Sequence, residues 1–238
     1  MPDKRTHRGA HPDDAGLFAA EKTDSLRTAM ADYSLLLTKG YADKSALKLV
    51  GDRFSLTERQ RLAIMRSSCT DGQLKSRGKK EFRITELANQ PIAVDGYNVL
   101  ITVEAAISGG AIFKGRDGCL RDIASIHGTY RRVDETIPAF QLIGDFLQQA
   151  AVSQILWLLD SPVSNSGRLK TLMAELCEKN GWQWDIQLVQ SPDKILIETD
   201  FFVASSDSVV LDGCKRWVNL AGAIIEKHLP QSWIIDLA

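Results

Sequence analysis

Three aspartates in this sequence each stand at the end of a short run that is typical of a buried strand. They are Asp95, Asp160 and Asp207. In an open parallel sheet, ligands bind outside the carboxyl ends of the strands, so the three carboxylates are expected at one edge. Asp193 follows a Ser-Pro turn and can reach that edge from the start of a short helix. The spacing therefore predicts a cluster of carboxylates drawn from distant parts of the chain.

Such a cluster is costly to bury, because ionised carboxylates lose hydration and repel one another. Mg²⁺ or Mn²⁺ is the natural compensation, since these ions prefer carboxylates, waters and phosphate oxygens. A bound ion lowers the pKa of water and shields a phosphate for attack. We therefore predict that Asp95, Asp160, Asp193 and Asp207 hold one or two such ions for phosphate-ester hydrolysis. The alternative is that these acids only cap the helices that follow their strands.

Polar residues beside these acids are candidates for positioning water or substrate. Asn98 lies one short turn after Asp95, where its amide can orient a water or a carboxylate, or cap a helix. The loop after Asp160 offers hydroxyls, an amide and helix N–H groups that suit a phosphate, namely Ser164, Asn165 and Ser166. A simple capped turn uses similar residues. The loop therefore either binds phosphate or forms a structural turn.

A nucleic-acid substrate needs local cations, because the formal net charge is only -1. Arg121 is predicted to contact the backbone of such a substrate. An equal alternative is a structural ion pair of Arg121 with Asp117 or Asp122. Asp122 is in turn a lesser candidate for a metal ligand.

The elements that position these residues are read from periodicity. Beyond Pro91, strand-like and helix-like segments alternate, which favours a mainly parallel sheet with helices on its faces. Strands are predicted at residues 92–95, 154–160, 184–189, 201–206 and 233–237. Helices are predicted at residues 98–107, 119–132, 139–151, 166–180 and 215–228. The fold class is α/β with a mainly parallel central sheet, preceded by a small all-helical domain.

The N-terminal third divides into a tail, helices and a linker. Residues 1–20 are polar and lack periodicity, which predicts a flexible tail. Residues 21–80 are expected to form a small helical domain, with helices after Ser25, Asp43 and Thr57, that ends in a basic linker from residue 70. The third helix carries arginines that either face phosphate or form a solvated surface, namely Arg59, Arg61 and Arg66. Residues 81–238 are expected to form the α/β domain.

Two motifs resemble the PIN-like nucleases, especially their NYN-type branch. They are Val94-Asp95-Gly96-Tyr97-Asn98-Val99 and the segment from Asp193 through Asp200 to Asp207. The resemblance covers about residues 90 to 238. It implies a PIN-like domain in which Asp95, Asp193 and Asp207 bind divalent metal, with Asp160 as a further acid, and in which RNA is the substrate and partner.

The chain departs from the nuclease pattern in two respects, and one is that the basic residues expected around an RNA groove are modest. The paired acids often found in the third metal segment are reduced here to Asp193. A noncatalytic RNA-binding or protein-docking module on the same fold is therefore the alternative function. A phosphatase of small nucleotides ranks last, because no short acid-x-acid nucleophile motif is visible.

The whole chain also resembles an uncharacterised prokaryotic family in which a helical domain precedes a PIN-like domain. The residues that carry this second resemblance are Gly40-Tyr41, Leu49-Val50-Gly51 and Gln60-Arg61. They say nothing about chemistry. No apolar run approaches the ~20 residues that span a bilayer, and no C-x-x-C pair is present, so we expect a cytoplasmic protein with reduced thiols and no membrane partner. Homodimerisation stays open, since no residue specifies it.

Overall fold

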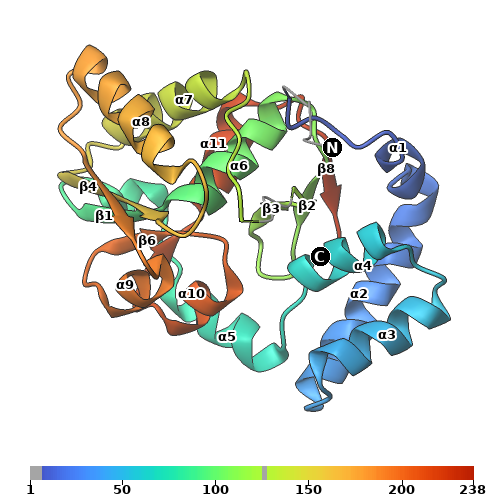
Figure 1. Ribbon diagram of the computed structural model, residues 1–238. Helices are drawn as coiled ribbons and strands as arrows, with labels where there is room; N and C mark the ends of the chain where they lie inside the picture. Colours follow the sequence, from blue (N-terminus) through green and yellow to red (C-terminus); the bar gives the residue numbers. More distant parts are fainter. Residues whose placement is uncertain (1–6, 125–127) are drawn as a thin grey trace.

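A computed structural model of the protein describes residues 7–124 and 128–238. Its core is a five-stranded sheet in which every neighbouring pair is parallel, in the order β5-β4-β1-β6-β7. The strands are β1 (Pro91–Asp95), β4 (Gln154–Asp160), β5 (Asp185–Val189), β6 (Phe202–Ala204) and β7 (Trp217–Val218). The predicted α/β class, with a parallel central sheet behind a helical region, is confirmed (Figure 1).

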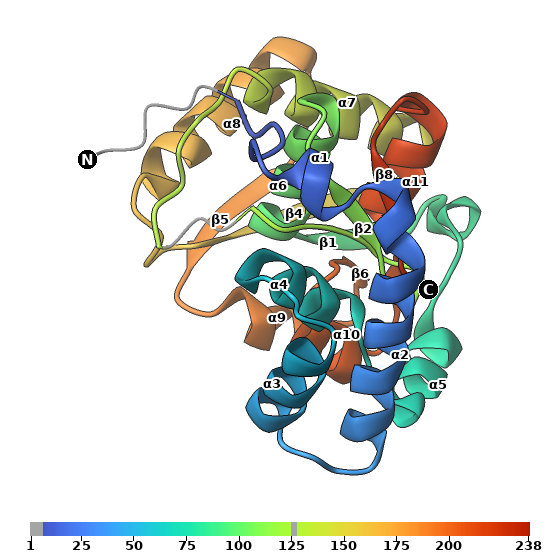
Figure 2. The ribbon, with the colours of Figure 1, turned by 90° about the vertical axis from the view of Figure 1, so that its right-hand side faces the viewer.

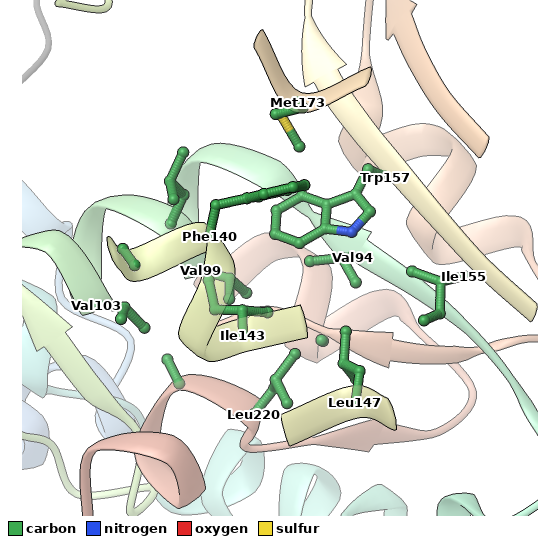
Figure 3. Close-up of a cluster of buried hydrophobic side chains, with 14 of the residues drawn as sticks. Val94, Val99, Val103, Phe140, Ile143, Leu147, Ile155, Trp157, Met173 and Leu220 are labelled. Atoms are coloured by element: carbon green, nitrogen blue, oxygen red, sulfur yellow. The ribbon is translucent and has the colours of Figure 1, made fainter. Parts of the chain in front are cut away.

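Alternate residues of the central strands enter two different cores, as the pleat of a strand requires. Val94 and Trp157 join the larger core, whereas Ala93 and Leu158 join the smaller one. The larger core is covered by α6 (Gly96–Ile107), α7 (Thr136–Gln149), α8 (Ser166–Asn180) and α11 (Leu220–His228). Within it the rings of Phe140 and Trp157 lie 5.3 Å apart (Figure 3). The short helices α9 (Pro192–Glu198) and α10 (Ser208–Gly213) cover the opposite face.

A second, three-stranded sheet differs from the prediction. It contains β2 (Ile112–Lys114), β3 (Leu120–Asp122) and β8 (Ile234–Asp236), in the order β3-β2-β8. The strand predicted at 233–237 thus exists but lies outside the main sheet. The helix predicted at 119–132 is wrong for its described part, because β2 and β3 form a hairpin whose turn contains Gly118 at φ +78°. The helix predicted at 215–228 is also wrong at its start, since β7 precedes α11.

The helical region precedes the main sheet and packs beside the second sheet (Figures 1 and 2). It contains α1 (Asp14–Leu17), η1 (Ala20–Lys22), α2 (Thr23–Thr38), α3 (Asp43–Arg53), α4 (Glu58–Ser67), α5 (Asp71–Lys80) and η2 (Ile84–Leu87). The predicted tail is wrong from residue 7 onward. Phe18 is buried against Phe113 with ring centres 4.7 Å apart, and the buried Asp14 pairs with Arg59. Residues 1–6 lie outside the described part.

The basic segment after residue 70 is a helix and not the predicted linker. Thr70 and Gln73 form a complete capping box at its start, which satisfies two otherwise free backbone N–H groups. The helix has no apolar face for packing. Instead Gln73, Arg77 and Lys80 recur along one face and bond to α10. The periodicity of α5 is therefore carried by polar residues, which a search for apolar spacing misses.

The residues of the second resemblance have structural roles. Gly40 takes a left-handed backbone (φ +84°) after α2. A Cβ on Gly51 would lie 2.0 Å from Nη1 of Arg61, so this glycine makes room for the guanidinium. Gln60 completes the capping box of α4 and donates to the carbonyl of Leu17. Separately, none of the helices in the described part of the chain combines the length and apolar character that crossing a membrane requires.

Candidate active site

Asp95 ends the central strand of the main sheet, at the point where the strand order reverses. From β1 the chain moves to β4 and β5 on one side, and then returns to β6 and β7 on the other. The crevice at such a reversal is where open α/β sheets bind ligands. Gly96 lets α6 start tightly against β4, because a Cβ there would lie 2.7 Å from the carbonyl oxygen of Leu158. Asp95 thus stands where the sequence predicted a site.

The carboxylate of Asp95 is only 5% exposed and is held by two donors. Asn98 Nδ2 donates to its Oδ2 at 2.8 Å, and Ser205 Oγ donates to the same oxygen at 2.7 Å. Burial raises the pKa of Asp95 to about 7, opposed by these two hydrogen bonds and reinforced by the charges of Asp207 and Asp193. Asp95 is therefore poised to change its charge near neutral pH.

The other three predicted acids lie within electrostatic reach of one another. Asp160 ends β4 half-buried, and its pKa is raised by burial and by the charge of Asp193. Asp193 lies in the first turn of α9, and its pKa is raised by partial burial and by the charge of Asp207. The pKa of Asp160 and that of Asp193 are thus each raised by the charge of another of these acids. The structure brings the four predicted acids to one end of the sheet.

The capping alternative applies to one acid and not to another. Oδ1 of Asp207 accepts from the N–H groups of Val209 (2.7 Å) and Val210 (3.2 Å), which caps α10. Asp95 occupies the N-cap position of α6 but makes no capping hydrogen bond. Both donors to Asp95 use Oδ2. Its Oδ1 and the Oδ2 of Asp207 accept no hydrogen bond from the described residues.

One observation favours a divalent cation at these acids, and another limits how many of them can bind it. Within residues 7–124 and 128–238, no lysine, arginine or histidine pairs with Asp95, Asp160, Asp193 or Asp207, so their negative charge is uncompensated. In the same residues, no three acid, histidine or cysteine side chains stand close enough to hold one ion together. An ion here would take one or two protein carboxylates and fill its remaining positions with water or phosphate, as Mg²⁺ commonly does.

Tyr97 and Ser161 are polar residues near the acids that were not among the residues predicted from the sequence. Tyr97 is 6% exposed, and its buried hydroxyl has no hydrogen-bond partner among the described residues. Burial and the charge of Asp160 raise its pKa to about 12, so the hydroxyl remains a donor at neutral pH. Ser161 Oγ, directly after Asp160, is likewise buried without a described partner. Orphan buried hydroxyls are costly, and a bound water or phosphate would satisfy them.

The loop after β4 is less free to bind substrate than predicted. Asn165 has a left-handed backbone (φ 69°), and its Nδ2 donates to the carbonyl of Tyr130. Ser166 is buried and bonds weakly to the carbonyl of Ser161. Ser164 is exposed, with its backbone bridged to Thr129. Of the three, only the Ser164 side chain is both exposed and free of hydrogen bonds within the described residues.

Arg121 does not reach a substrate, which corrects its predicted role. Its guanidinium is 7% exposed and forms a two-point ion pair with Asp117, at 2.8 and 2.7 Å. Its Nε donates to the carbonyl of Ser206 at 2.7 Å. A side chain committed in this way cannot contact an RNA backbone. The structural alternative, an ion pair with Asp117, is the one observed.

A second arginine, Arg77, forms a buried triad with Asp117 and Arg121 next to Asp207. Nη1 of Arg77 donates to Asp117 at 2.6 Å, and its Nη2 donates to the carbonyl of Ser208 at 3.3 Å. Arg121 and Arg77 therefore hold the carbonyls of the two residues that flank Asp207 and share one acid between them. Because Arg77 belongs to α5, the helical region helps to fix this acid.

The remaining basic and acidic candidates are also engaged internally. Asp122 ends β3, accepts from Thr102 Oγ1 and the Ala124 N–H, and its Oδ1 lies 3.6 Å from Nη1 of Arg66. Arg59 pairs with Asp14, and Arg61 pairs with Asp52. Two of the three arginines on α4 are thus neither a phosphate-binding face nor a solvated one. The four cysteines are buried and unpaired.

The comparisons with known proteins divide the chain where the structure does. The family described as a domain of unknown function (DUF5616) matches residues 84–223, and the family described as a protein of unknown function (DUF434) matches residues 25–80. An uncharacterized protein of Methanocaldococcus jannaschii is 29% identical over 204 residues, which cover 85% of this chain and 97% of that protein. No solved structure matches the chain. The helical region and the α/β core thus occur together in that relative.

Proposed function

The chain belongs to the family described as a domain of unknown function (DUF5616). From the acids at the end of its main sheet, we propose that the protein is a metal-dependent phosphodiesterase that cleaves RNA. Asp95, Asp160, Asp193 and Asp207 would hold Mg²⁺ or Mn²⁺ on a PIN-like domain. RNA as the substrate rests on the resemblance of the motif around Asp95 to NYN-type nucleases. A cytoplasmic place of action rests on the sequence, in which no apolar run approaches the ~20 residues that span a bilayer.

The buried carboxylate of Asp95 is the observation that carries the proposal. It sits at the reversal of strand order, is held by two neutral donors, and has its pKa raised to about 7 by burial and by neighbouring acids. Keeping such a group without a cation is unfavourable, and a divalent ion would stabilise its ionised form. A role in stability alone gives no reason for this arrangement.

The residues of this chain would act by holding and orienting. Asn98 and Ser205 fix Oδ2 of Asp95, and Oδ1 accepts no hydrogen bond from the described residues and would face the ion. The buried Tyr97 hydroxyl, whose pKa the charge of Asp160 raises, would donate to water or to a phosphate oxygen. Arg77 and Arg121 hold the backbone on both sides of Asp207. A bound divalent ion supplies an acidified water and shields the phosphate charge.

The test is cleavage of RNA by the purified full chain. We expect turnover of single-stranded RNA with Mg²⁺ or Mn²⁺, none with EDTA, and a loss of at least roughly a hundredfold in Asp95→Asn. Asp185→Asn is the matched control, because Asp185 is an exposed acid at the start of β5, whereas the four candidate acids lie at the other end of the sheet. Full turnover by a folded Asp95→Asn variant would reject the proposal.

A noncatalytic RNA-binding or protein-docking module is the second candidate. It is favoured by the finding that, in the described part of the chain, no three potential ligands gather around one point. Such a module would bind RNA equally well with EDTA and with Mg²⁺, and would cleave none of the RNA or DNA substrates offered. Those two measurements separate the candidates.

A further inference from the structure

A groove between the helical region and α10 leads to Asp207. Its volume is about 390 Å³, which lies in the range of pockets that hold small ligands. Tyr33 and Leu37 of α2 and Met65 and Arg66 of α4 line one side, and Asp207 and Ser208 line the other. We call it the α2–α10 groove. Figure 2 shows α10 facing the helices of this region.

Helix α5 fixes α10 to the helical region by specific hydrogen bonds. Arg77 Nε and Gln73 Nε2 both donate to Asp212 at 2.7 Å, and Lys80 Nζ donates to the carbonyls of Leu211 and Asp212 at 2.8 Å. All three donors lie on α5, and both acceptor residues lie on α10. The groove is therefore built in advance, which lowers the entropic cost of binding.

The groove combines one cation with a hydroxyl donor and apolar surface. Arg66 is partly exposed, and its Nη1 donates to the carbonyl of Asp122 at 2.8 Å and lies 3.6 Å from Oδ1 of the same residue. Its Nε and Nη2 have no acceptor in the described residues and can face a ligand. Tyr33 is 2% exposed, and its hydroxyl makes no hydrogen bond within the same residues. Met65 is 43% exposed at the mouth.

We propose that the α2–α10 groove binds the nucleotide of the RNA chain that adjoins the phosphodiester at Asp207. A base would pack on Leu37 and Met65, Arg66 would pair with a phosphate, and the Tyr33 hydroxyl would donate to the sugar or the base. Two acids also line the groove, Asp43 and Asp207, so a wholly anionic occupant does not fit, whereas a nucleotide can place its neutral parts beside them. The inference rests on the proposed function.

The experiment measures RNA binding by the full chain carrying Asp95→Asn, in EDTA, so that no cleavage interferes. The probe is a fluorescent single-stranded RNA decamer of mixed sequence, followed by anisotropy over a range of salt. The groove variants are Arg66→Gln, Tyr33→Phe and Met65→Glu. The controls replace a cation, a tyrosine and an apolar residue in the same way at exposed positions that do not line the groove, namely Lys48→Gln, Tyr41→Phe and Leu49→Glu.

We expect Arg66→Gln to weaken binding roughly tenfold and Tyr33→Phe roughly threefold to fivefold, with Met65→Glu at least as harmful as Arg66→Gln. The slope of log Kd against log salt should fall by about 0.7 in Arg66→Gln alone, because one phosphate contact is lost. A purely structural role of Arg66 would not change that slope. The controls should stay within about twofold of the parent.

Two outcomes overturn the inference. Binding that is equal in parent and groove variants shows that the RNA lies elsewhere and that the groove serves another occupant, such as a protein segment. No binding by the parent rejects RNA as the occupant as well. Failure of the proposed function is a different result, namely RNA bound through the groove but not cleaved with Mg²⁺ or Mn²⁺.

Discussion

The hydroxyl of Ser205 donates a 2.7 Å hydrogen bond to Oδ2 of Asp95, although the two residues are 110 positions apart in the chain. Ser205 directly follows β6, which is the neighbour of β1 in the sheet, and the strand order reverses between these two strands. Ser205 Oγ also accepts from the N–H of Asp207 at 3.0 Å. One serine thus links the side chain of one candidate acid to the backbone of another.

Ser205→Ala is expected to shift the pH dependence of the site. The hydrogen bond lowers the pKa of Asp95, so its loss raises that pKa above about 7 and delays ionisation on the way to alkaline pH. The rising limb of cleavage against pH should move up by roughly half to one unit. Ser34→Ala, which removes another buried serine hydroxyl, one that bonds to Met30 and to none of the four acids, should leave the profile in place. A profile that is identical in Ser205→Ala would contradict the assigned coupling.

Asp95→Asn should make the metal-free protein more stable at alkaline pH. Because the folded pKa of Asp95 is raised to about 7, the unfolded chain ionises first, and this group costs the native state stability as pH rises from about 4 to about 7. The amide keeps an oxygen that accepts from Asn98 and Ser205 but never ionises. Urea denaturation in EDTA should show a gain of about 2 to 4 kcal/mol at pH 8 and almost none at pH 4. A gain that does not vary with pH would show that Asp95 does not carry this penalty.

The sequence predicted those elements whose periodicity is apolar. The strand at 154–160 and the helix at 166–180 have the predicted bounds, because buried Leu, Ile and Trp mark them. Asp95 was identified because it follows such a strand directly. In contrast, α5 packs through Gln73, Arg77 and Lys80, and polar residues in a polar segment give no apolar signal.

Residues that act through distant partners could not be predicted either. The bond of Ser205 to Asp95 and that of Arg121 to the carbonyl of Ser206 join residues that only the folded chain brings together. Tyr97 carried a weak signal, since it lies inside the motif around Asp95. For Arg121 the sequence left a substrate contact and an ion pair with Asp117 as equal alternatives, and only the folded chain shows that the ion pair forms.

Arg77→Met should destabilise the protein strongly. The change removes a guanidinium that is 1% exposed and leaves Asp117 with one partner, while the carbonyl of Ser208 loses its donor. Breaking a buried ion pair on one side costs about 3 to 5 kcal/mol. Arg53→Gln, which removes a surface pair with Asp32, should cost at most about 0.5 kcal/mol in the same urea titration. Similar losses of unfolding free energy in both variants would mean that the triad does not stabilise the backbone around Asp207.

Two glycine-to-alanine changes should have opposite effects on the free energy of unfolding. A Cβ on Gly96 would meet the Leu158 carbonyl oxygen at 2.7 Å, so Gly96→Ala must push α6 away from β4 and should cost about 1 to 3 kcal/mol. Gly78 lies within α5, and a Cβ there would have no neighbouring atom within 4 Å, so Gly78→Ala should stabilise by about 0.5 to 1 kcal/mol through helix propensity. Thermal and urea unfolding of both variants give the comparison. A neutral Gly96→Ala would show that the close approach beside Asp95 relaxes freely and does not set the position of this acid.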